Sequence, residues 1–242
     1  MIQELSPGIY DLSLKHNGMP IHPVLLWNEQ EGATLIDTGM TGTLKQLQEA
    51  VQETGVNWNE IRRIILTHQD IDHIGNLPAI AASLPSRPEI WAHKEDSDVI
   101  EGRKPFLKMS AERLASMPEA MRQLIEGLSK DLKEMKVTRF LEDGEELSLH
   151  GGLQVIHTPG HTPGHLSFYL PKEKLLLAAD ELNAADGELK GPNEPFTPDM
   201  ELAMQSMTKF LPLAIERILC YHGGMFTEQP EEAIRRLAQQ SK

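Results

Sequence analysis

The stretch LTHQDIDHIGN, residues 66–76, decides how the rest of this sequence is interpreted. Within six positions, directly after an apolar run, it places four potential metal ligands: His68, Asp70, Asp72 and His73. Only 10 of the 242 residues are histidine, so two histidines and two aspartates this close together are not expected by chance. Imidazole and carboxylate groups at this density are typical of a site for zinc, iron, manganese or cobalt.

Three further apolar runs each lead to a residue that can bind a metal. VIHTPG is followed by His161, LLLAAD ends in Asp180, and ILCYHGG contains His222. Because the ends of neighbouring strands lie side by side, side chains that are distant in the sequence can converge there. Asp180 arrives alone from its own strand, and a carboxylate between two cations can bridge them. The four places together predict one site built at strand ends.

The order of the expected elements gives two similar halves. In the first half we expect strands at 8–14, 23–27, 33–39, 61–68 and 89–93, with helices at 41–55 and 74–85. In the second half we expect strands at 153–160, 165–171, 174–180 and 216–224, with helices at 199–211 and from about 230. Turn residues separate the strands, and apolar spacing marks the helices. This order predicts an α/β chain in which two sheets pack together with helices outside.

Between the halves, residues 95–136 follow a helical pattern. Apolar residues recur every three or four positions, at Leu114, Met117, Met121, Leu124, Leu128, Leu132 and Met135. We expect this amphipathic segment to be interrupted near Pro118 and Gly127. Two roles stay open: packing against the core, or forming a lid or pocket wall whose flexible methionines adapt to an apolar group.

The composition is that of an ordinary globular protein and argues against several classes of partner. The 23 basic and 36 acidic residues give a net charge of −13, which disfavours binding to nucleic acid. No apolar stretch approaches the roughly 20 residues of a membrane span, and no basic and then apolar leader opens the sequence. Cys220, the single cysteine, excludes an intrachain disulfide. We therefore expect a cytoplasmic protein that acts on a small molecule, without a nucleic-acid or membrane partner.

In order and spacing, these motifs resemble those of the metallo-β-lactamase fold superfamily. The family's His-x-His-x-Asp-His signature corresponds here to His68-Gln69-Asp70-Ile71-Asp72-His73, followed by the later ligands His161, Asp180 and His222. LIDTG at 35–39 matches the family's early Asp-x-Gly turn, with Asp37 placed to orient a ligand. The resemblance covers nearly the whole chain. It implies a four-layer αββα sandwich of two mixed β-sheets with outer helices, as one domain over residues 1–242 with a helical insertion at about 95–136.

The resemblance also implies a binuclear site for two divalent metal ions, with zinc as the first expectation. The first ion would be bound by His68, Asp70 and His161. The second would be bound by Asp72, His73 and His222, with Asp180 bridging both. A hydroxide between the ions would attack a carbonyl carbon, and Asp72 would steer the water and pass a proton to the leaving group.

Asp70 departs from the signature, which has histidine at this position. A carboxylate adds a negative charge and a hard oxygen ligand, which moves the metal preference towards iron or manganese. A di-iron redox or oxygen-using enzyme of the same fold is therefore a second hypothesis, although its flavin-binding partner domain finds no room in 242 residues. A first site weakened by Asp70, which leaves one bound ion, is a third hypothesis, and a non-catalytic metal-binding module is a fourth.

Among hydrolases of this fold, we expect one that cleaves an ester, lactone or thioester bond in a small molecule. The export signal of a secreted β-lactamase is not visible, and a charge of −13 suits a tRNA-processing ribonuclease poorly. Glyoxalase-II-like thioesterases carry a helical segment after the last histidine that is longer than the single helix expected here from about residue 230. A lactonase-like activity is one member of the class that remains.

The residues outside the signature carry weaker expectations. We expect His165 to shape the turn after His161, and His157 to lie on a strand face. The remaining histidines are expected at the surface: His16, His22, His93 and His150. Tyr221, beside His222, is a candidate substrate contact.

Overall fold

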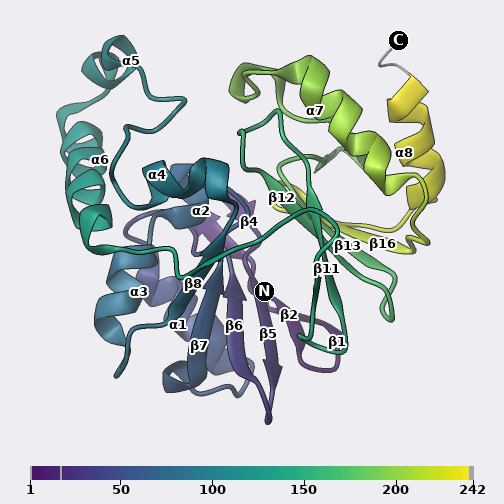
Figure 1. Ribbon diagram of the computed structural model, residues 1–242, viewed down its shortest axis with the longest axis horizontal. Coiled ribbons are helices and arrows are strands. Elements are labelled where there is room, and N and C mark those ends of the chain that lie inside the picture. Colours follow the sequence, from purple (N-terminus) through teal and green to yellow (C-terminus); the bar gives the residue numbers. More distant parts are fainter. Residues whose placement is uncertain (1, 17, 240–242) are drawn as a thin grey trace.

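Two β-sheets packed face to face form the centre of the molecule, as predicted (Figure 1). The computed structural model describes residues 2–16 and 18–239. In this part of the chain the first sheet has seven strands, in the order β1-β2-β5-β6-β7-β8-β9. Their bounds are Gln3–Ser6, Ile9–Asp11, Val24–Asn28, Gly32–Ile36, Ile61–Ile65, Glu89–Ala92 and Arg139–Phe140. Strands β6 to β9 pair in parallel and the others antiparallel, so the sheet is mixed.

The second sheet has six strands among the described residues, in the order β10-β11-β12-β13-β16-β17. Their bounds are Glu146–Leu147, Leu153–His157, Leu166–Leu170, Leu175–Ala179, Arg217–Cys220 and Gly224–Phe226. Only the pairing of β13 with β16 is parallel in this sheet. Two small hairpins stand apart from both sheets: β3 (Leu14–His16) with β4 (Met19–Ile21), and β14 (Asn183–Ala185) with β15 (Glu188–Lys190).

Helices cover the outer faces of the two sheets (Figure 1). Helices α1 (Leu44–Glu53) and α3 (Leu77–Ser83) flank the first sheet, and α7 (Met200–Met207) and α8 (Pro230–Gln239) flank the second. The insertion supplies α4 (Ser97–Ile100), α5 (Ala111–Ser116) and α6 (Glu119–Asp131), and α2 is the single turn Ile71–Ile74. Short 3-10 turns complete the set: Trp58–Glu60, Lys94–Asp96, Leu132–Glu134, Glu194–Phe196 and Thr208–Phe210.

Alternating side chains of the strands divide the core into three layers. Along β5, Leu25 packs in the layer beneath α1 and α3, whereas Val24 and Leu26 pack between the sheets. Along β13, Leu177 packs between the sheets and Leu176 packs in the layer beneath α7 and α8. Each strand therefore has two apolar faces, which a strand covered on both sides requires. This arrangement is the four-layer αββα sandwich.

The strands that carry potential ligands end earlier than predicted. Strand β6 ends at Ile36, β7 at Ile65 and β11 at His157, three residues before the ends expected from the apolar pattern. Beyond these points the chain leaves the strand ladders and continues into the loops that carry Asp37, His68 and His161. The predicted strand 216–224 is in fact the hairpin of β16 and β17, and Gly223, at φ 100°, lies in its turn.

The insertion is helical as predicted, with one difference. The interruption near Pro118 is confirmed, since this residue separates α5 from α6. The interruption near Gly127 is wrong, because α6 continues through that residue. On α6, Ile125 and Leu128 are buried, whereas Leu124 is exposed. No helix in the described part of the chain combines the length and the apolar composition that a bilayer crossing requires.

Candidate metal centre

The seven predicted ligands lie where the chain leaves the strands. His68 and Asp70 follow β7, and the next helical turn, α2, contains Asp72 and His73. In the second sheet, β11, β13 and β16 run in the same direction, because two antiparallel pairings separate β11 from β13 and β13 pairs in parallel with β16. The C-terminal ends of these strands therefore share an edge, and the loops that follow carry the three remaining side chains: His161, Asp180 and His222.

The structure brings all seven side chains together, in two groups. The first contains His68, Asp70, His161 and Asp180, and the second contains Asp72, His73 and His222. Within each group, the potential ligand atoms lie within 4.8 Å of one another. Asp180 also reaches the second group, with Oδ1 3.2 Å from His73 Nε2 and Oδ2 3.4 Å from His222 Nε2. Asp180 thus lies between the groups, at the place the sequence predicts for a bridging carboxylate.

Buried hydrogen bonds orient two of the imidazoles. Asp37, at φ 62° just after β6, accepts hydrogen bonds of 2.8 Å from the Thr67 backbone N–H, the Thr67 hydroxyl and His73 Nδ1. The Thr67 hydroxyl in turn accepts a hydrogen bond from His68 Nδ1 at 3.0 Å. Because both Nδ1 atoms are engaged, Nε2 is the atom that each ring presents to the aspartates. Asp37 therefore has the orienting role predicted from the sequence, and Thr67 is a partner that the sequence did not reveal.

Several buried atoms of the two groups have the character of metal ligands. Among the described residues, His68 Nε2, His73 Nε2 and Asp180 Oδ1 are buried and make no hydrogen bond. Leaving a buried polar atom unpaired costs about 1–3 kcal/mol, and a bound cation would remove that cost. Imidazole nitrogen and carboxylate oxygen are the ligands that zinc, iron and manganese accept. The residues present therefore fit a divalent metal ion.

The charges around the histidines also favour a cation. Burial lowers the pKa of His73, but the carboxylates of Asp180, Asp37 and Asp72 outweigh burial and raise this pKa well above its ordinary range. Burial likewise lowers the pKa of His222, and the carboxylates of Asp180 and Asp72 raise it to about 10. The carboxylates that favour the protonated rings would also attract a divalent ion, which would take the place of a proton.

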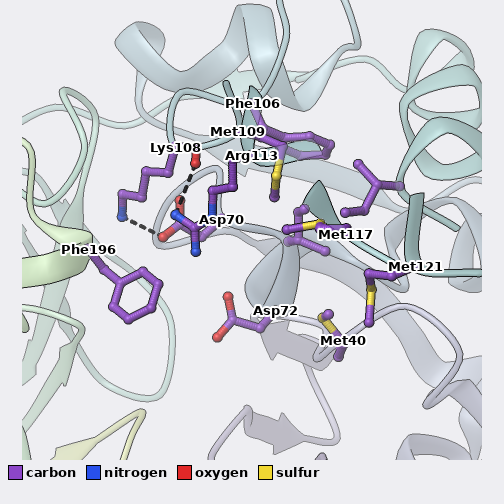
Figure 2. A pocket seen from close by; sticks show the side chains of 12 residues that line it. Met40, Asp70, Asp72, Phe106, Lys108, Met109, Arg113, Met117, Met121 and Phe196 are labelled. Carbon is purple, nitrogen blue, oxygen red and sulfur yellow. Dashed lines mark hydrogen bonds and ion pairs between the residues drawn. The ribbon is translucent and has the colours of Figure 1, made fainter. Parts of the chain in front are cut away.

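Lys108, a residue that sequence reasoning missed, reaches into the first group (Figure 2). Its Nζ lies 2.5 Å from Asp70 Oδ2 and 2.6 Å from His161 Nε2. Burial raises the pKa of Asp70, but His68 and then Lys108 outweigh it and hold this pKa well below its ordinary range. Lys108 is the second lysine of the segment KPFLKMS and carries no sequence signal, because lysines most often extend into solvent.

A largely apolar cavity of about 300 Å³ opens beside Asp70 and Asp72 (Figure 2). Its apolar lining comes from α2, α6, the loop before α1, the segments flanking α5 and the turn before α7: Met40, Ile71, Phe106, Met109, Met117, Met121, Ile125 and Phe196. Lys108 and Arg113 add two cationic side chains. The insertion therefore forms a wall of the pocket. Met117 and Met121, two of the apolar residues predicted from the helical pattern, line the cavity, and so does Ile125, the neighbour of Leu124.

Further residues near the site support it from behind. Tyr221 is buried, donates a hydrogen bond to the Asp72 carbonyl at 2.5 Å and stacks on His73, so the structure does not place it as a substrate contact. His165 accepts a hydrogen bond from the Asp180 backbone N–H at 3.2 Å, which adds to its predicted role in the turn. The surface expectation for His22 is wrong, because its side chain is buried against the Asp11 carboxylate at 2.8 Å.

Comparison with known families agrees with the fold and the site. The model of the metallo-beta-lactamase superfamily matches residues 17–222, which is most of the chain. The matched range includes the strand ends that carry the seven potential ligands. This chain belongs to the metallo-β-lactamase superfamily.

Individual relatives share the fold at low sequence identity. The chain is 27% identical over 234 residues to the probable metallo-hydrolase YflN of Bacillus subtilis, covering 91% of this chain and 85% of that protein. It is 28% identical over 211 residues to the hydroxyacylglutathione hydrolase GloC of Haemophilus influenzae, covering 86% and 87%. The crystal structure of the metallo-beta-lactamase family protein TTHA1429 from Thermus thermophilus superposes with a TM-score of 0.73 at 23% identity, covering 98% and 80%.

Proposed function

We propose that this protein is a metal-dependent hydrolase that cleaves an ester, lactone or thioester bond in a small molecule bearing an apolar substituent. The observation that carries this proposal is the position of the apolar cavity, which opens directly beside the carboxylates of Asp70 and Asp72. A reacting bond near the metal ligands would place its substituent among the methionines of the insertion. The relatives named as hydrolases support the reaction class.

Thioesters stay within the proposal. The relative named as a hydroxyacylglutathione hydrolase is covered to 87% by this chain. This similarity supports a thioester as one of the candidate bonds. A lactonase-like activity stays a prediction, because nothing in the pocket distinguishes a cyclic from an open ester.

The chemistry assigned to each side chain follows from its position. A bound divalent ion would supply a hydroxide at neutral pH and a Lewis acid for the carbonyl oxygen, and zinc is the proposed ion. Asp37, Thr67 and Tyr221 hold His73 and Asp72 in place. Asp72 faces the cavity with a partly exposed carboxyl group, so it is the proposed group for steering water and carrying a proton to the leaving group.

The test is steady-state hydrolysis of ester, lactone and thioester substrates, each carrying either an acetyl-sized or a long apolar substituent. We expect turnover in at least one bond class. Within that class, the substrate with the long apolar substituent should have a higher kcat/KM than the substrate with the acetyl-sized one. Met121→Trp, which fills the cavity, should lower kcat/KM for the long substituent about tenfold and leave the short one unchanged. Leu124→Trp, on the exposed side of the same helix, is the matched control. No turnover of any substrate, or equal effects of both tryptophans, would count against the proposal.

A further inference from the structure

The environment of Lys108 is unusual for a lysine. Its side chain is only 11% exposed, and lysine is almost never buried unless its charge is paired. Here the ammonium contacts Asp70 Oδ2 at 2.5 Å and His161 Nε2 at 2.6 Å. These two atoms belong to the first group of potential ligands, and they lie 3.1 Å apart. The ammonium therefore lies where a cation shared by these two residues would lie.

The segment that carries Lys108 is tied to the ligand loop. Gln69, between His68 and Asp70, accepts a hydrogen bond from the Leu107 backbone N–H at 3.2 Å. Gln69 in turn donates to the buried Asp96 carboxylate through its backbone and its side chain, both at 3.0 Å. Arg113 donates to the Lys108 carbonyl at 3.2 Å. The backbone before the lysine is thus tied to the ligand loop, and the lysine's own carbonyl is held within the insertion.

The same Asp96 connects the insertion to the loop of His161. Its carboxylate accepts hydrogen bonds from the Thr162 hydroxyl at 2.7 Å and from the Gly164 backbone N–H at 2.8 Å. Asp96 is fully buried. One carboxylate therefore fixes the insertion, the loop after β7 and the loop after β11 relative to one another, and Lys108 is positioned by that network.

The hydrogen bonds of His161 match an ammonium partner. The Thr197 hydroxyl donates to the Asn193 carbonyl at 2.9 Å, so it accepts from His161 Nδ1 at 3.2 Å. His161 Nε2 then carries the lone pair and accepts a hydrogen bond from Lys108. Asp70 supplies a carboxylate at the position where the family signature has histidine. A carboxylate pairs with an ammonium, whereas a neutral imidazole would not balance its charge.

A metal ion and this ammonium exclude each other at the first group. An ion bonded to Asp70 and His161 at about 2.0–2.2 Å would lie within a few ångströms of Nζ, where two cations repel strongly. The second group differs, since its aspartate, Asp72, contacts His222 at 3.2 Å. We propose that the Lys108 ammonium takes the place of the first metal ion beside Asp70 and His161, so that the native chain binds one divalent ion, at Asp72, His73 and His222 together with Asp180.

This inference rests on the proposed function only in taking the second group as a metal site. It narrows the sequence expectation of two ions to one. It also gives Lys108 a role at the cavity, which the lysine helps to line.

The test is the number of metal ions per chain, measured by elemental analysis after equilibrium dialysis of the full chain against zinc and, separately, against manganese. The native protein should hold about one equivalent, and Lys108→Met should hold about two. Lys104→Met removes an exposed lysine of the same insertion, paired with Asp98 at 2.8 Å, and should stay at one. Lys108→Gln, which drops the charge but keeps a hydrogen-bond donor, replaces Lys108→Met if the methionine variant does not fold.

The outcomes separate this inference from the proposed function. Two equivalents in the native protein, or one equivalent in both native protein and Lys108 variants, would overturn the role of Lys108 without touching the hydrolase proposal. One equivalent that rises to two, in a protein that hydrolyses nothing, would support Lys108 and overturn the hydrolase. No bound metal in any form would overturn both.

Discussion

Asp37 shows how a single residue outside the ligand groups controls their geometry. It lies at a left-handed backbone position, accepts three hydrogen bonds of 2.8 Å and is almost fully buried. Through Thr67 it acts on His68, and directly it acts on His73. Its carboxylate, after that of Asp180, is also one of the groups that raise the pKa of His73.

Replacing the Asp37 carboxylate by an amide of similar size should weaken metal binding without changing the packing of the core. We expect Asp37→Asn to lower metal affinity about 10–100-fold, because the amide cannot accept from both Thr67 and His73 as the carboxylate does. Asparagine also tolerates a positive φ, so backbone strain is not the cause. The measurement is calorimetric titration with zinc. Asp11→Asn, which breaks the His22 pair outside both ligand groups, is the control, and an equal loss in the two variants would contradict the role given to Asp37.

The residues that the sequence analysis misjudged share a physical reason. The ligands could be predicted because histidine and aspartate gathered at strand ends have no common structural explanation. Lys108 and Thr67 could not, since their roles depend on contacts with Asp70, His161 and Asp37 that only the tertiary structure creates. His22 looked like a surface residue for the same reason, because its carboxylate partner lies eleven positions away.

At the scale of the elements, prediction worked where a periodic pattern existed. Apolar runs closed by turn residues placed the buried strands, and the spacing of Leu47 and Val51 placed α1. Strand ends were extended by up to three residues, because apolar residues continue past the last ladder bond into buried ligand loops such as that of Leu66 and Thr67. Gly127 was expected to break α6, but the helix continues through it. The glycine faces solvent, and a side chain at this position would contact no neighbouring residue.

The junction between β8 and the insertion predicts a dependence of stability on pH. Here the rings of His93 and His157 stack at 3.9 Å, and the half-buried His93 caps the turn Lys94–Asp96. Burial first, and then the neighbouring His157, lower the pKa of His93 from its ordinary value of 6.5. The folded state therefore resists protonation, while the unfolded chain accepts the proton. The stabilisation is fully present above pH 6.5 and is lost as the pH falls through the lowered pKa.

His93→Asn should remove this part of the acid sensitivity. Asparagine can still cap the turn but does not titrate. Urea denaturation at pH 8 and pH 5 measures the free energy of unfolding at the two ends of the window. The decrease between them should be smaller in the variant than in the native protein. An unchanged decrease would mean that His93 does not contribute to acid unfolding.

At the scale of the whole molecule, the site joins the two halves. Four potential ligands come from the end of β7 in the first sheet, and three come from the second sheet. The chemistry would therefore depend on how the sheets pack as well as on each ligand. The insertion adds the apolar wall beside the site, and its α4, α5 and α6 rise above the end of the sandwich that holds α2 (Figure 1). The one-domain organisation and the cytoplasmic location stay predictions.

The central claim is that hydrolysis depends on a metal ion held by these residues. The most direct measurement is the rate at which the native protein hydrolyses its preferred substrate in three states. These are the protein as purified, the protein after a chelator has removed its metal and has itself been removed, and the same protein after zinc is added back. The account predicts loss of at least about 100-fold in kcat/KM on removal and full recovery on restoration. Asp180→Asn, which removes the carboxylate between the two groups, should not recover. Undiminished turnover by the metal-free protein would contradict the account.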